Sequence, residues 1–286
     1  MPQIDFSAYA RHIATTNNTQ MMLPVIEKEL LHYEILRAMQ EAGLLSNIVF
    51  QGGTCLRLCY GAPRYSEDLD FSGGADFKTS DLSNLRDCIT QALPRKYAVT
   101  AEVRGPKERI ALVQKWRIRI DTIPDRPDLP SQKIALEVAA IPSYTRQAQM
   151  LQLNYEGLPA SYEDVMLFAE SPEEILADKL VAFVCSQYIR HRDIWDMFWI
   201  MRRPHINLEQ ARDLQKQKVI DYGEQERFEH NLVRVTEQLP SIIESDDFRT
   251  QMKRFLPAET LQSTLERPEY RSVLQKDIRS LYSKLG

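Results

Sequence analysis

The clearest helical pattern near the N-terminus covers residues 21–45, MMLPVIEKELLHYEILRAMQEAGLL, where apolar side chains recur every three or four residues. This spacing gathers them on one helical face, and Gly43 marks the end of the pattern. A short apolar run follows at residues 48–50 and stops at a Gly-Gly pair. We therefore predict an amphipathic helix and then a short buried strand that ends at the glycines.

Strict alternation of polar and apolar residues appears in the middle of the chain. In residues 115–123, KWRIRIDTI, one face carries Lys115, Arg117, Arg119 and Asp121, and the other is apolar. This two-residue period is typical of a strand with one buried face. The next strand is predicted at 133–141, and the short connection favours an antiparallel pair in a mixed sheet. A helix over 79–97 and a strand over 99–105 are predicted before this pair.

The pattern changes in the second half of the chain. Ser171 is placed as an N-cap, with Pro172 at the first helical position and Glu174 three residues after the cap, which is a capping-box pattern. Beyond it strand patterns fade, and helical segments are predicted at 188–202, 207–219, 224–238, 244–255, 258–266 and 268–285. The fold class is therefore α+β, with an α+β domain over residues 1–165 and an all-helical C-terminal domain over 166–286.

Composition and charge narrow the class of protein. The 286 residues hold no apolar run near the length of a membrane span, and residues 1–16 lack the basic and apolar regions of a secretory signal. Four cysteines without a metal-ligand spacing suggest reduced thiols in a cytoplasmic protein. The net charge is −4, yet residues 86–119 hold nine Lys or Arg against three Asp or Glu. That surplus suits a phosphate-rich ligand, or it is a solvated face.

The most informative chemistry lies in the segment RYSEDLDF, residues 64–71. In an extended chain Ser66, Asp68 and Asp70 share one face, while Leu69 takes the other. Two carboxylates side by side repel each other unless a cation neutralises them. Mg²⁺ is bound by one or two carboxylates and completes its shell with water and substrate phosphates. We predict a Mg²⁺ site at Asp68 and Asp70, although a lone Asp-x-Asp is also common on solvated segments.

A glycine turn precedes these acids by about fifteen residues. Gly52, Gly53 and Thr54 follow the predicted strand and open a segment with helical spacing. Glycines allow close backbone approach, and N–H groups at a helix start bind phosphate oxygens. Alone such a turn is ordinary, but together with the aspartates it predicts a site for a nucleoside triphosphate and its metal.

Glu137 is the candidate third metal ligand, because it is an acid inside the otherwise apolar strand 133–141. A third carboxylate would complete a two-metal arrangement. Asp121 on the neighbouring strand is the fallback, and a surface-facing glutamate is the alternative.

Two features of the helical half also carry charge among apolar residues. Lys179 lies on or beside an apolar helical stripe and either extends to solvent or reaches a phosphate. Asp193 and Asp196 are three residues apart in an aromatic-rich helix, and ion pairs with Arg190 or Arg192 would satisfy them. Taken singly, each of these residues has a structural explanation.

Four sequence blocks together resemble the AbiEii family of nucleotidyltransferase toxins of abortive-infection and toxin–antitoxin systems. They are GGT at 52–54, RYSEDLDF at 64–71, EEILADKLVAF at 173–183 and RDIWDMF at 192–198, in the order of the family. The resemblance implies a polymerase-β-like nucleotidyltransferase domain. It further implies an NTP substrate, an RNA acceptor (notably the 3′ end of tRNA) and a cognate antitoxin, with direct antitoxin binding left open.

The resemblance also implies roles for individual residues. Asp68 and Asp70 would hold Mg²⁺ on the triphosphate. The glycine turn, led by Gly53 and Thr54, would contact phosphate. The remaining implied site residues are Arg64 and Ser66 beside the metal, Lys179 on the triphosphate, and Asp193, with Asp196 second, as the functional acid. Glu137 is not fixed by any family motif.

Three function hypotheses follow. The first is a Mg²⁺-dependent nucleotidyltransferase toxin, and the second is a non-catalytic regulator of the same fold that binds nucleotide or RNA. The third is a metal-dependent phosphodiesterase that uses water as the nucleophile. The intact pair of aspartates favours an enzyme over a regulator, and release of pyrophosphate would separate transfer from hydrolysis.

Overall fold

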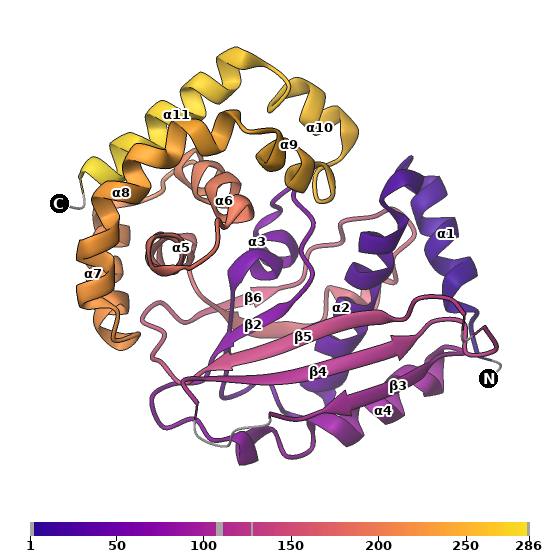
Figure 1. Cartoon of the computed structure of the whole chain (residues 1–286). Helices are drawn as coiled ribbons and strands as arrows, with labels where there is room; N and C mark the ends of the chain where they lie inside the picture. The colour runs from indigo at the N-terminus through magenta and orange to yellow at the C-terminus, as the bar shows by residue number, and fades with distance from the viewer. Residues whose placement is uncertain (1–2, 107–110, 127, 285–286) are drawn as a thin grey trace. The chain divides into compact units, whose positions relative to one another are not determined.

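The computed structural model describes residues 3–106, 111–126 and 128–284, and the chain divides into two compact units, Met1–Glu170 and Ser171–Gly286 (Figure 1). The first unit is built around a seven-stranded sheet. Its strands are β1 (Val49–Gln51), β2 (Leu69–Ser72), β3 (Thr100–Arg104), β4 (Val113–Asp121), β5 (Gln132–Ala139), β6 (Gln147–Met150) and β7 (Met166–Ala169). Its α-helices are α1 (Phe6–Thr16), α2 (Leu23–Glu41), α3 (Gly52–Tyr60) and α4 (Leu85–Lys96).

The sheet is mixed, as predicted. The strand order is β3-β4-β5-β2-β1-β7-β6, with β2 parallel to β5 and β1 parallel to β7. The remaining neighbours are antiparallel, including the predicted β4–β5 pair. The central position of β2 places its acids beside β5 on one side and β1 on the other.

The alternation read in the sequence of β4 is realised in its burial. Trp116, Ile118 and Ile120 are buried, whereas Arg117 and Arg119 are exposed. Helices α2 and α4 pack against each other and against β5 and β3, respectively. The first unit therefore has an apolar sheet surface in its core and a charged surface on the outward side of β3, β4 and β5.

Three elements of the first unit are absent from the sequence-based prediction: α1, β6 and β7. Strand β6 has the sequence QAQM and is largely exposed, so no apolar alternation identifies it. Strand β7 pairs with both β1 and β6, and the sheet therefore extends to Ala169, beyond the predicted domain boundary at residue 165.

The second unit is helical in its described part. Its helices are α5 (Pro172–Cys185), α6 (His191–Met201), α7 (Leu208–Asp221), α8 (Gln225–Glu244), α9 (Asp246–Lys253), α10 (Ala258–Ser263) and α11 (Pro268–Ser283). Helix α5 starts as predicted, because the Ser171 hydroxyl accepts a hydrogen bond from the Glu174 N–H at 3.3 Å. The Glu174 carboxylate forms an ion pair with the fully buried Lys218 of α7 at 2.8 Å. Within the described ranges, no helix combines the length and apolarity needed to cross a membrane.

Candidate active site

The two aspartates lie where β2 enters the sheet. Asp68 immediately precedes the strand, Asp70 is its second residue, and Leu69 between them is fully buried. The Asp68 carboxylate accepts a hydrogen bond from the Ala135 N–H of β5 at 3.2 Å. Asp70 is in register with Gln51 of β1 and with Glu137 of β5. Local alternation therefore sets which way the acids face, and the sheet fixes their neighbours.

The start of α3 lies directly against Asp70. Gly52 has a φ of +76°, and a Cβ atom at this position would lie 2.6 Å from Asp70 Oδ2. Only glycine combines this left-handed backbone with such a close approach. The N-cap residue, Gln51, makes no side-chain hydrogen bond to the helix. The first turn of α3 therefore has no side-chain cap, and its N–H groups can bind an anion.

The other residues of the glycine turn support this arrangement. The Thr54 side chain is buried, and its hydroxyl donates to the Asp68 carbonyl oxygen. Arg64 is also buried; its Nη1 donates to the Tyr65 carbonyl oxygen at 2.6 Å, and its Nη2 lies against Gly53. A Cβ atom on Gly53 would lie 2.9 Å from Ser66 Oγ. In this structure the Thr54 hydroxyl therefore holds the main chain at Asp68, and Arg64 and Ser66 lie against the glycine turn. Their implied roles, Thr54 on phosphate and Arg64 and Ser66 beside the metal, stay predictions.

Glu137 lies beside the acids but is engaged elsewhere. It is the register partner of Asp70, and its carboxylate forms an ion pair with Lys115 of β4. Across the described ranges, no cluster of three or more His, Cys, Asp or Glu side chains is close enough to hold a metal ion. Glu137 therefore does not form a ready-made three-acid site with Asp68 and Asp70 in this structure, and its metal role stays a prediction.

Asp121, the fallback ligand, lies at the other end of β4. It is six positions from Lys115, the partner of Glu137, which corresponds to about 20 Å along a strand. Asp121 pairs with Arg119 at 3.1 Å and accepts from the Thr100 hydroxyl at 3.2 Å. This fallback is wrong, because the register places Asp121 far from the acid pair.

Lys179, Asp193 and Asp196 form one buried ion cluster inside the helical unit. Lys179 Nζ lies 2.9 Å from Asp193 Oδ1 and 2.8 Å from Asp196 Oδ2, and the Lys179 side chain is only 8% exposed. The Arg190 guanidinium also pairs with Asp193. Burial alone would raise the pKa of Asp193, but the charges of Lys179 and Arg190 outweigh burial and hold this pKa well below its usual value. The cluster confirms that the acids have cationic partners, with Lys179 as the shared one.

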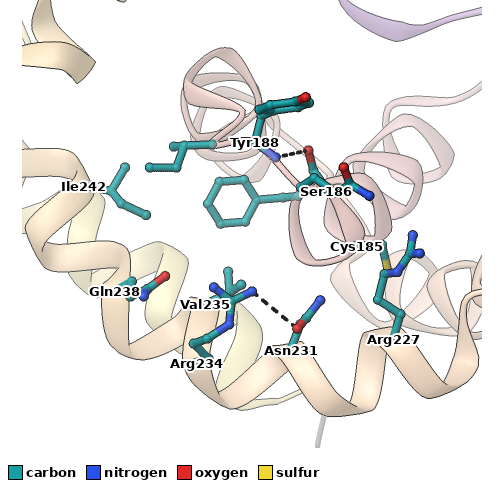
Figure 2. A pocket seen from close by; sticks show the side chains of 12 residues that line it. Cys185, Ser186, Tyr188, Arg227, Asn231, Arg234, Val235, Gln238 and Ile242 are labelled. Atoms are coloured by element: carbon teal, nitrogen blue, oxygen red, sulfur yellow. Dashed lines mark hydrogen bonds between the residues drawn. The ribbon is translucent and has the colours of Figure 1, made fainter.

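The helical unit also contains a separate cavity of about 210 Å³, shown in Figure 2. It lies between the C-terminal end of α5, the residues that follow it and one side of α8. Tyr188, Arg227, Asn231 and Arg234 are among the residues that line it, and none of the site residues expected from the sequence does so. The cavity is therefore distinct from the Lys179 cluster.

One buried acid that sequence analysis missed is Glu170, directly after β7. Its side chain is fully buried and accepts a hydrogen bond from the Ser72 hydroxyl of β2 at 3.1 Å. Its backbone N–H donates to Phe50 of β1, and its carbonyl accepts from the Tyr60 hydroxyl of α3. Glu170 thereby joins the elements that carry the candidate site. The signal was an acid at the end of an apolar run, directly after a strand that was not predicted.

A protein-family profile described as "Nucleotidyl transferase AbiEii toxin, Type IV TA system" matches residues 34–276. The chain belongs to the AbiEii family. The matched range contains all four sequence blocks on which the resemblance rested, and it reaches into both compact units. The nucleotidyltransferase class of this AbiEii protein is therefore shown at the level of the family.

Two of the solved structures that resemble this AbiEii protein are from Helicobacter pylori. JHP933 from Helicobacter pylori is 19% identical with a TM-score of 0.56, over 91% of this chain and 93% of that one. A second H. pylori protein, described as a candidate nucleotidyltransferase, is 20% identical with a TM-score of 0.54, over 91% and 96% of the two chains. At such identities the likeness shows the fold alone, and it confirms the expected architecture. No curated protein sequence gives a significant match.

Proposed function

We propose that this AbiEii protein transfers a nucleoside monophosphate from an NTP to an RNA acceptor, with Mg²⁺ as the metal. The observation that carries the proposal is the approach of Asp70 to Gly52, the first residue of α3. It joins two neighbouring carboxylates to a helix N-terminus without a side-chain cap. The carboxylates suit a cation, and the helix N-terminus suits a phosphate. A metal–nucleotide complex contains both.

The residues fit Mg²⁺ in their chemistry. Asp68 and Asp70 provide oxygen donors, and Mg²⁺ binds through one or two carboxylates while it keeps waters and substrate phosphates in its shell. Two protein carboxylates are therefore sufficient, even with Glu137 held by Lys115. When bound, the metal supplies positive charge that offsets the charge of the transferring phosphate.

The protein groups around this place would bind and orient the substrate. The first-turn N–H groups of α3 bind phosphate oxygens, and Gly52 and Gly53 allow the triphosphate to approach the backbone. The acceptor hydroxyl oxygen then bonds to the α-phosphorus in line with the departing pyrophosphate, and one proton is released. Thr54 holds the main chain of Asp68 in place during this step.

Lys179 and Asp193 remain proposed site residues, with Asp196 as the alternative acid. The family resemblance places Lys179 on the triphosphate. In this structure its ammonium group is bound by both aspartates. We propose that the aspartates hold the Lys179 side chain in one orientation, and that Lys179 itself acts on the nucleotide.

RNA is the proposed acceptor, and the 3′ end of tRNA is the specific candidate. The basic residues Arg117 and Arg119 of β4 are exposed on the sheet that carries the aspartates. The description of the family as a toxin of a type IV system supports a toxic role opposed by a cognate antitoxin. We place the protein in the cytoplasm, where its nucleotide and RNA substrates occur.

The proposal is tested by incubating the purified protein with Mg²⁺, total tRNA and each α-labelled NTP in turn. We expect label in RNA with at least one nucleotide, with pyrophosphate released in equal amount. Loss of label in Asp70→Asn would support the assigned site. Release of nucleoside monophosphate into solution without labelled RNA would instead indicate hydrolysis.

A second candidate, a regulator that binds nucleotide or RNA without catalysis, is favoured by one observation. The Lys115–Glu137 ion pair engages the acid that was expected to complete a two-metal arrangement. Asp70-dependent nucleotide binding without label transfer would support this candidate.

A further inference from the structure

The outward surface of the sheet contains two pairs of like charges placed opposite each other. In the register of β3, β4 and β5, Arg104 is the partner of Arg117, and Arg119 is the partner of Lys133. Directly opposed like charges destabilise a sheet. All four residues are exposed, with side-chain exposures of 72% for Arg104 and 55% for Arg119. We call these four residues the basic strip.

The acids near the basic strip pair with two of its four residues. Glu102 pairs with Arg104 at 2.7 Å, and Asp121 pairs with Arg119 at 3.1 Å. Within the ranges that the structure describes, Arg117 and Lys133 have no ion pair with a carboxylate. Lys115, the third basic residue expected on β4, is neutralised by Glu137. Two cations of the strip are thus available to an anionic ligand.

The basic strip continues toward the candidate active site within the same unit. Arg117 is in register with Ala135, whose N–H donates to the Asp68 carboxylate. Arg117 is therefore two strands from Asp68, or about 10 Å at the usual strand spacing. That distance corresponds to about three stacked nucleotides at ~3.4 Å each. An RNA whose 3′ end lies at the acids can therefore place upstream phosphates on the strip.

We propose that the basic strip binds the sugar–phosphate backbone of the RNA acceptor, on the 5′ side of its reacting end. The claim that the bound RNA is the acceptor rests on the proposed function. The claim that the basic strip binds RNA does not. Contacts between Arg or Lys side chains and phosphate oxygens position a nucleic acid and carry no sequence information. The proposal therefore predicts an acceptor preference for length and charge, and little preference for the sequence upstream of the end.

Binding is tested first, in the catalytically silent Asp70→Asn background, with a fluorescent 20-nucleotide RNA at several salt concentrations. The test variant is Arg117→Gln/Lys133→Gln, because neither residue has a carboxylate that the change would leave unpaired. The matched control is Lys276→Gln/Arg279→Gln on α11, which removes one exposed lysine and one exposed arginine. In the test variant only, we expect weaker RNA binding. The slope of log K against log salt concentration should also become shallower by about 1.4, because each of two lost phosphate contacts contributes ~0.7 on a single strand.

Transfer is tested next, with active protein and two acceptors, the 20-nucleotide RNA and a dinucleotide too short to reach the strip. Arg117→Gln/Lys133→Gln should raise KM for the long acceptor and leave transfer to the dinucleotide unchanged. If the unsubstituted protein labels neither acceptor, the proposed function fails. The binding experiment then still shows whether the basic strip binds RNA. An unchanged salt slope overturns the proposal. The proposal is also overturned if Arg117→Gln/Lys133→Gln weakens binding of an acidic peptide but not of RNA, since the strip would then serve a protein partner.

Discussion

Gly52 lies so close to Asp70 that a Cβ atom on the glycine would come within 2.6 Å of the Asp70 carboxylate oxygen Oδ2. This close approach joins the start of α3 to Asp70 of β2, two features that lie eighteen positions apart in the sequence. The conformation of Gly52, with φ at +76°, is also one that side chains disfavour. Glycine is therefore required at position 52 by the backbone conformation and by the close approach of Asp70.

We expect Gly52→Ala to abolish most transfer activity, because the new methyl group must displace Asp70. The matched control is Gly43→Ala, at φ +71°, where an added Cβ atom would meet no other atom within 4 Å. Both changes should lower the free energy of unfolding by about 1–2 kcal/mol through left-handed strain. Chemical denaturation and the transfer rate measure the two effects. Equal activity loss in both variants would contradict a specific role for the Gly52–Asp70 contact.

Thr54→Val should lower the free energy of unfolding by about 1–3 kcal/mol, because the Asp68 carbonyl oxygen loses its buried donor. Transfer activity should fall as well, since Asp68 is no longer held by α3. Thr54→Ser keeps the hydroxyl and is the control. If Thr54→Ser, which keeps the hydroxyl, reduces activity as much as Thr54→Val, loss of the hydrogen bond to Asp68 does not explain the effect.

The low pKa of Asp193 predicts a pH-dependent contribution to stability. A carboxyl group whose pKa is lowered by folding stabilises the folded state fully above its unfolded pKa of about 3.9, and this contribution is lost as pH falls further. Asp193→Asn should lower the free energy of unfolding by up to about 3 kcal/mol at neutral pH. The loss is limited because Lys179 keeps its ion pair with Asp196. The difference from the unsubstituted protein should shrink below about pH 4.

Tryptophan fluorescence during urea unfolding at several pH values measures this difference, because Trp195 and Trp199 are both on α6. A difference between the two proteins that is the same at pH 7 and pH 3 would show that the Asp193 charge does not stabilise the fold.

Lys218 offers a second test of buried charge in the helical unit. It is fully buried, 2.8 Å from Glu174 and 3.3 Å from Asp178. Lys218→Met should destabilise the protein by about 3–5 kcal/mol, because two acids lose their cation. Lys216→Met is the control: its ion pair with Asp213 is exposed and should contribute less than about 1 kcal/mol. Thermal unfolding compares the two variants, and equal effects would contradict the difference drawn from burial.

The features of the site that are local in sequence could be predicted from it. The glycines stop a three-residue strand, alternation places Asp68 and Asp70 on one face, and Ser171 caps α5. Each depends on neighbours within a few residues, where backbone geometry and side-chain period act directly. The alternation in β4 likewise predicted which of its residues face outward.

The contacts between distant segments could not be predicted in this way. The register that pairs Asp70 with Glu137 depends on which strands meet, and so does the ion pair of Glu137 with Lys115. Lys179 was expected to meet solvent or phosphate, but helix packing places two aspartates around it. Buried charges find partners wherever the fold brings them, and a linear pattern does not contain that information.

The most direct test of the central claim is the incorporation of an α-labelled nucleotide into RNA by four proteins in parallel. These are the unsubstituted chain, Asp68→Asn, Asp70→Asn, and Asp125→Asn as a control on an exposed acid. We predict Mg²⁺-dependent labelling by the unsubstituted chain and the Asp125 variant. Both site variants should lose at least about a hundredfold, since each would weaken the binding of the Mg²⁺ that offsets the charge of the reacting phosphate. Labelling that persists in Asp68→Asn and Asp70→Asn would contradict the assignment of these two aspartates to the active site.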